Sequence, residues 1–83
     1  MKARVTVTLK AGVLDPQGQA IEGSLQSLGF PGVAAVRQGK VFDIVLDETH
    51  GTDESAARSQ LTSMCEKLLA NTVIENYAVE ITN

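Results

Sequence analysis

Two residues of this sequence could do chemistry by type alone, a single histidine and a single cysteine. His50 lies in the acidic stretch 47–54, but the spacing of the carboxylates around it matches no EF-hand or zinc pattern. We interpret the stretch as a solvated loop and expect no metal site. Cys65 falls on or beside the apolar stripe of an expected helix, without a sequence neighbour that could activate a thiol. We expect it to pack in the core and not to act as a nucleophile.

A pair of glycines offers the next candidate, a phosphate-binding loop. Gly18 and Gly23 have the two-glycine spacing of such a loop, but Ser24 stands where the lysine should be. The stretch also lies inside an expected helix, whereas a phosphate loop joins a strand to a helix. We therefore expect no catalytic residue and no bound cofactor on this chain.

Length and charge exclude further classes of function. Eighty-three residues make one domain over residues 1–83, too small for a large catalytic fold. The net charge of −3 opposes binding to nucleic acids and to acidic membranes. One cysteine and the lack of a long apolar run predict a cytoplasmic protein.

The elements that must position any site follow from periodicity. Residues 3–10 alternate apolar and polar side chains, which predicts a strand. Asp15 and Pro16 are typical of a helix start, and Gly29 of a helix end. Thr52, with two acidic residues after it, is the expected cap of a second helix, whose apolar stripe includes Leu68. The expected elements in chain order are a strand at 3–10, a helix at 16–28, strands at 33–37 and 41–46 around a Gln38-Gly39 turn, a helix at 53–70 and a strand at 77–81.

This order, βαββαβ, predicts an α+β ferredoxin-like fold, a four-stranded antiparallel sheet with two helices on one face. The other face would be open. The strand at 41–46 is apolar on both sides, with Phe42 and Ile44 on one and Val41 and Val45 on the other. We therefore expect the chain to self-associate through its sheet as a homodimer or a higher oligomer.

Three segments together resemble one family. They are Leu9-Lys10 with residues 13–18, Val36-Arg37 with Gly39-Lys40, and residues 65–75 with Tyr77. In length, motif order and spacing they resemble the PurS family along essentially the whole chain, and the third segment is the most specific.

The resemblance implies a place in a purine-biosynthesis complex, phosphoribosylformylglycinamidine synthase. A large synthetase subunit would use ATP and Mg, a glutaminase subunit would release ammonia from glutamine, and this chain, as a dimer, would join them without catalysis. No cofactor would bind to this chain. The residues expected at partner interfaces are Asp15, Gln17, Arg37, Lys40, Val45, Asn71, Thr72 and Glu75.

Arg37 and Lys40 flank the expected turn and would oppose each other as like charges, which is mildly destabilising. Either they form a solvated tip, or they dock on an acidic or phosphate-bearing partner surface. A second function also stays open, a stand-alone dimeric regulatory domain that binds a small metabolite, because such sites lack a short motif.

Overall fold

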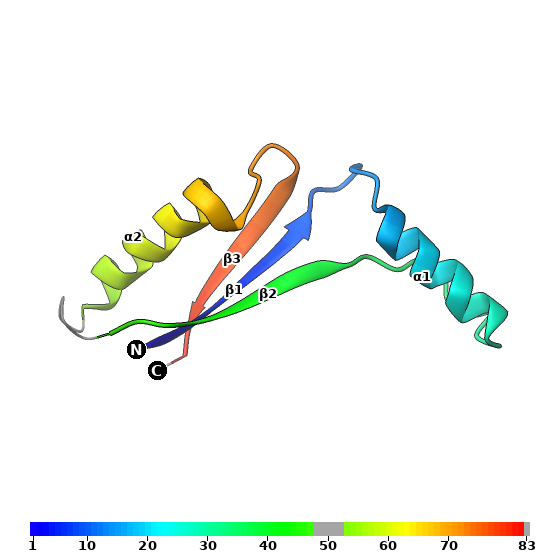
Figure 1. Cartoon of the computed structure of the whole chain (residues 1–83), viewed down its shortest axis with the longest axis horizontal. Helices are drawn as coiled ribbons and strands as arrows, with labels where there is room; N and C mark the ends of the chain where they lie inside the picture. The colour runs from blue at the N-terminus through cyan, green and yellow to red at the C-terminus, as the bar shows by residue number, and fades with distance from the viewer. Residues whose placement is uncertain (48–52, 83) are drawn as a thin grey trace.

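A computed structural model of the chain describes residues 1–47 and 53–82. Its strands form an antiparallel sheet in the order β2-β1-β3, and α2 continues into a short π-helix, η1 (Figure 1). At the sheet centre Val5 of β1 lies opposite Phe42 of β2 and Val79 of β3. The elements are β1 (Lys2–Leu9), α1 (Pro16–Ser27), β2 (Gly39–Val45), α2 (Glu54–Met64), η1 (Cys65–Leu69) and β3 (Glu75–Ile81).

The core lies between β1 and the α2–η1 helix. The alternation expected for the first strand is confirmed, because Ala3, Val5 and Val7 are buried on one face of the sheet. From the helix, Leu61 and Cys65 pack over that face and are fully buried. Few side chains are buried, so each of them carries a large share of the stability.

The expected fourth strand is wrong. Within the described residues the sheet has three strands, and the stretch 33–37 forms none. The Gln38 N–H donates to Asp15 Oδ2 at 2.8 Å, and Arg37 donates to two backbone carbonyls, those of Lys10 and Val13. These bonds hold the stretch beside the start of α1, so it cannot fold back onto β2 as a hairpin.

The expected packing of both helices on one sheet face is also wrong. α2 packs against β3, whereas α1 projects beyond the end of the sheet (Figure 1). The chain measures 51 × 25 × 14 Å, and its radius of gyration is 16.5 Å. A compact domain of this length would have a radius of about 12 Å.

The helix caps follow the sequence closely at α1 and less closely at α2. Asp15 caps α1 by accepting the Gly18 N–H at 2.9 Å, and Gly29 has the positive φ expected after the helix. At α2 the cap is Asp53, which accepts the Ser55 N–H, and not the expected Thr52, which lies outside the described residues. The helix is thus capped by a carboxylate at its positive end.

Leu68 does not join the buried stripe of the second helix as expected. In η1 the Ala70 N–H donates to the Cys65 carbonyl, five residues back, at 2.9 Å. A π-turn fits an extra residue into the turn and changes the direction of the following side chains. Leu68 is consequently 83% exposed, while Cys65 stays in the core.

Replacing Gly39 with alanine is expected to lower the free energy of unfolding by about 1–3 kcal/mol, because a Cβ there would lie 2.7 Å from the Val7 carbonyl oxygen. That oxygen belongs to the central strand and cannot move cheaply. Gly32→Ala is the matched control, since nothing lies within 4 Å of its Cβ position. Urea unfolding at one protein concentration compares the two, and equal midpoints would contradict the close approach.

Candidate functional site

Half of the expected interface residues line one groove where the chain leaves the sheet. We call this place the junction; it is a groove of about 300 Å³ at the carboxyl end of β1. It brings together the start of α1, the start of β2 and the start of β3. Its lining residues are Val7, Leu9, Leu14, Asp15, Pro16, Gln17, Gln38, Gly39, Lys40 and Glu75.

Asp15 is the buried polar group of the junction. One carboxylate oxygen accepts the Gly18 N–H and the other accepts the Gln38 N–H. These bonds, that from Gln38 first, lower the pKa of Asp15, and the nearby Arg37 guanidinium adds to the effect. The carboxylate thus ties α1 to the start of β2, a structural role that the sequence reasoning did not assign to it.

Acidification is expected to weaken this tie. The pKa of Asp15 is lower in the folded chain than in the unfolded one, so its stabilising effect is complete above the unfolded pKa of about 4. It is lost as the pH falls through the folded pKa. The melting temperature of Asp15→Asn should therefore be several degrees below that of wild type at pH 7. This difference in melting temperature should become smaller below pH 3, as thermal unfolding followed by circular dichroism would show. Asp53→Asn is the control, because it removes the charge of a cap residue that accepts the Ser55 N–H and keeps the accepting oxygen. A difference in melting temperature between Asp15→Asn and wild type that is constant with pH would contradict this account.

Arg37 and Lys40 do not oppose each other at a hairpin tip, so that expectation is wrong. Arg37 donates to the carbonyl oxygens of Val13 at 3.0 Å and Lys10 at 3.2 Å. Lys40 instead faces Glu75, with Nζ 3.7 Å from Oε2. Each cation therefore has a partner in its own chain.

The turn before β3 completes the junction. Glu75 Oε1 accepts the Asn71 N–H at 2.7 Å, and Asn71 Oδ1 accepts the Val73 N–H at 3.2 Å. Glu75 therefore joins this turn to Lys40 on β2. Gln17 is exposed and lines the junction, and Thr72 is exposed in the turn before β3.

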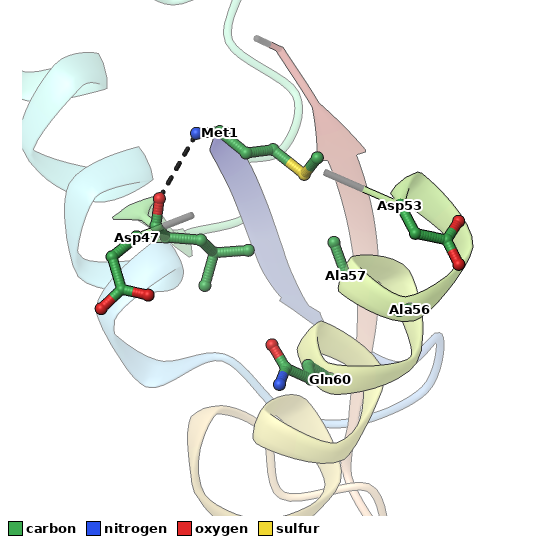
Figure 2. A pocket seen from close by; sticks show the side chains of 7 residues that line it. Met1, Asp47, Asp53, Ala56, Ala57 and Gln60 are labelled. Atoms are coloured by element: carbon green, nitrogen blue, oxygen red, sulfur yellow. Dashed lines mark hydrogen bonds between the residues drawn. The ribbon is translucent and has the colours of Figure 1, made fainter. Parts of the chain in front are cut away.

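Val45 is the predicted interface residue that the structure places elsewhere. It lies at the opposite end of β2, across from Lys2, and is 75% exposed. A small cavity of about 70 Å³ occupies this end, between α2 and the chain start (Figure 2). The amino group of Met1 donates to the Leu46 carbonyl there at 3.3 Å. A cavity of this size holds water and not a metabolite.

The structure tests one of the two residues that were considered for chemistry, Cys65 and His50. Cys65 is fully buried against Val5, Val7 and Ala70, which confirms the packed thiol. Burial, with a contribution from Glu66, raises the pKa of Cys65 and keeps it protonated. His50 lies outside the described residues.

Over residues 1–47 and 53–82, no group of three histidine, cysteine or acidic side chains could hold a metal ion. No helix in this part of the chain is long and apolar enough to cross a membrane.

The sequence reasoning missed one surface. An apolar groove of about 720 Å³ runs along α2 and η1 above β2, and we call it the α2 groove. It was missed because Leu68 was expected to be buried. Its lining residues are Ile44, Ser59, Gln60, Ser63, Met64, Lys67, Leu68 and Leu69.

Comparison with known proteins decides which family has these features. A family model described as PurS, phosphoribosylformylglycinamidine (FGAM) synthase, matches residues 2–83. The chain belongs to the PurS family. A PurS subunit of phosphoribosylformylglycinamidine synthase from Synechocystis sp. is 52% identical over 79 residues, which are 95% of this chain and 76% of that protein.

Solved PurS structures have the same fold. The crystal structure of PurS from Methanocaldococcus jannaschii matches this chain with a TM-score of 0.85 at 39% sequence identity. The match covers 99% of this chain and 95% of the Methanocaldococcus jannaschii chain. A chain of the Thermotoga maritima structure named PurLQS has a TM-score of 0.83 at 29% identity, covering 95% of this chain and 93% of that one. The overall fold of this chain is therefore the fold of these PurS structures.

Proposed function

We propose that this chain is the non-catalytic small subunit of the phosphoribosylformylglycinamidine synthase complex of purine biosynthesis, where it joins the synthetase and glutaminase subunits. The observation that carries the proposal is the family match over residues 2–83. The similar PurS of Methanocaldococcus jannaschii is one of the subunits of formylglycinamide ribonucleotide amidotransferase in the purine biosynthetic pathway. The likeness to a chain of the Thermotoga maritima structure named PurLQS supports a role as a subunit of a complex.

The chemistry of the side chains supports a joining role. The one thiol is buried and protonated, and Asp15, Arg37, Lys40 and Glu75 are engaged with their own chain at the junction. Nucleophilic or acid–base catalysis needs such groups poised toward a substrate. We therefore propose that the other subunits use ATP, Mg and glutamine and that this chain binds no cofactor. We also propose that the complex is cytoplasmic.

The same residues suggest where partners dock. The bonds of Arg37 and Asp15 shape the junction, and Gln17 presents an exposed side chain in it. Thr72 is exposed in the turn before β3. We propose that the junction contacts a partner subunit and that two copies of the chain associate in the assembly. A stand-alone metabolite-binding domain is the less favoured function, because the family match points to a subunit.

Reconstitution tests the function. The two other subunits, purified and mixed with ATP and Mg, should form the amidine from glutamine only when this chain is added. Turnover with ammonia in place of glutamine should continue without it and serves as the control for the synthetase subunit. Full glutamine-dependent turnover in the absence of this chain would overturn the proposal.

A further inference from the structure

The charged groups of the junction differ in how far they face solvent. Its carboxylates are turned inward, because Asp15 is buried and the side chain of Glu75 is 12% exposed. Its cations are turned outward, since the side chain of Lys40 is 61% exposed and Arg37 is exposed at the edge. With Lys10, whose carbonyl Arg37 binds, these are three cations and two carboxylates. The charge that faces solvent here is therefore positive, although the net charge of the chain is −3.

Both carboxylates are held in place by backbone groups of their own chain. The two oxygens of Asp15 accept the N–H groups of Gly18 at 2.9 Å and Gln38 at 2.8 Å. Glu75 Oε1 accepts the Asn71 N–H at 2.7 Å. Turning either carboxylate outward would leave buried or half-buried N–H groups without an acceptor, which is costly. Neither carboxylate can therefore move out to neutralise the cations at the surface.

Lys40 is the cation that a second molecule can bind most easily. Its Nζ lies 3.7 Å from Glu75 Oε2, which is longer than the roughly 2.7–2.9 Å of a charge-assisted hydrogen bond. An ammonium group has three N–H donors, and this contact engages at most one of them. Arg37 differs, because its guanidinium donates to the carbonyls of Val13 and Lys10 and so holds the fold together. Lys40 can take another acceptor without the loss of any of these bonds.

Apolar side chains surround Lys40 in the junction. Leu9, Leu14 and Pro16 line the same groove, and Leu14 is 64% exposed. An ion pair that such a surface shields from water is stronger than one at a fully wet surface. The groove volume of about 300 Å³ is at the lower end for a small-molecule pocket. It fits an extended segment of another protein that lays one or two side chains in the groove.

We propose that the junction binds an acidic segment of one of the two other subunits, in which a carboxylate pairs with Lys40 and a neighbouring apolar side chain packs on Leu14 and Pro16. This rests on the proposed function, which places the junction against a partner subunit, and it adds the chemistry of that partner. The exposed amides of Gln17 and Gln38 line the same groove and can donate to the backbone carbonyls of the segment. A nucleic acid fits less well, because its affinity needs many cations and the chain is acidic.

Zero-length cross-linking in the assembled complex tests the pairing. A water-soluble carbodiimide joins an ammonium group and a carboxylate that touch, forming an amide with loss of water, and mass spectrometry of the digested product identifies both residues. We expect Lys40 to be joined to an aspartate or glutamate of the synthetase or the glutaminase subunit. The free chain is the control and should give the link from Lys40 to Glu75, its neighbour at 3.7 Å. Links in the complex from Lys40 only to Glu75, or only to a second copy of this chain, would overturn the proposal.

Substitutions give an independent readout, the affinity of this chain for the other two subunits in a titration. Lys40→Gln should lower the affinity about fivefold at low salt, and the difference from wild type should shrink as salt is added. Lys40→Arg, which keeps the charge, should bind like wild type. Lys2→Gln removes an exposed lysine at the opposite end of β1 and should change the affinity by less than about twofold. Equal affinities of Lys40→Gln and Lys2→Gln would overturn the proposal.

A phosphate-bearing ligand is the other occupant that this test separates. Inorganic phosphate should weaken the complex no more than sodium chloride of the same ionic strength does, because we expect a carboxylate at Lys40. A larger loss with phosphate, absent in Lys40→Gln, would assign the groove to a phosphate group and overturn the acidic segment.

The proposed function and the docking chemistry can fail separately. If glutamine-dependent turnover requires this chain but Lys40 forms no link to another subunit, the docking chemistry alone is wrong. If Lys40 is joined to another subunit but turnover does not require this chain, the proposed function alone is wrong. A chain that binds neither of the other subunits would overturn both.

Discussion

Leu61→Ala is expected to lower the free energy of unfolding by about 2–5 kcal/mol, a large part of the roughly 5–15 kcal/mol available to a small domain. Among residues 1–47 and 53–82, Leu61 is the largest fully buried side chain, and it comes from the helix that covers the sheet. Truncating it leaves a cavity between α2 and β1. Because the core is small, little neighbouring structure can close that cavity.

Urea denaturation followed by circular dichroism measures the loss, at one fixed protein concentration because association contributes to stability. Val73→Ala is the matched control, since Val73 is an aliphatic residue that is 81% exposed in the turn before β3. It should change the free energy of unfolding by less than about 0.5 kcal/mol. A Leu61→Ala midpoint equal to that of Val73→Ala would mean that the core does not lie where the structure places it.

Val5→Asp should abolish the fold. Val5 is fully buried in the central strand, opposite Phe42 and Val79. Ionising a carboxyl group buried there costs at most about 4 kcal/mol at pH 7, because the group takes up a proton once its pKa rises above 7, and leaving the protonated carboxyl without hydrogen-bond partners adds about 1–3 kcal/mol. This penalty is similar to the whole stability of a small domain.

The control for this variant adds the same charge to the same strand. Thr8→Asp places a carboxylate on the exposed face of β1, so it should cost only about 1 kcal/mol through its lower strand propensity. The two proteins are compared by one-dimensional proton NMR dispersion and by solubility. A folded Val5→Asp protein, or an unfolded Thr8→Asp protein, would reverse the assignment of the two faces.

Local patterns were sufficient for the elements whose stability is local. The alternation of residues 3–10 predicted β1 and its buried face, because a strand side chain can point only to one face or the other. Asp15 and Pro16 predicted the start of α1 at the correct residue. Three segments of the sequence, of which residues 65–75 are the most specific, were enough to predict membership of the PurS family. The family match over residues 2–83 confirmed this prediction.

Local patterns failed where distant residues compete for the same backbone groups. A β-rich stretch next to Gln38-Gly39 is typical of a hairpin, but Asp15 takes the Gln38 N–H from 23 residues away. Gly39 is needed for its close approach to the Val7 carbonyl and not for a turn. The π-turn after Met64 likewise moved Leu68 from the expected core to the α2 groove.

The residues predicted to form the partner interface lie in two different places in the structure. Four of its predicted residues line the junction, although nothing in their sequence positions requires this; they are Asp15, Gln17, Lys40 and Glu75. Arg37 and Asn71 form hydrogen bonds beside it, and Val45 lies at the far end of β2. The sequence by itself determined the strand faces, the helix caps and the family, because each depends on side chains a few residues apart or on a pattern along the chain. Only the tertiary structure decided the direction in which residues 10–38 leave the sheet, since that direction depends on hydrogen bonds from Arg37 and Gln38 to residues more than twenty positions earlier.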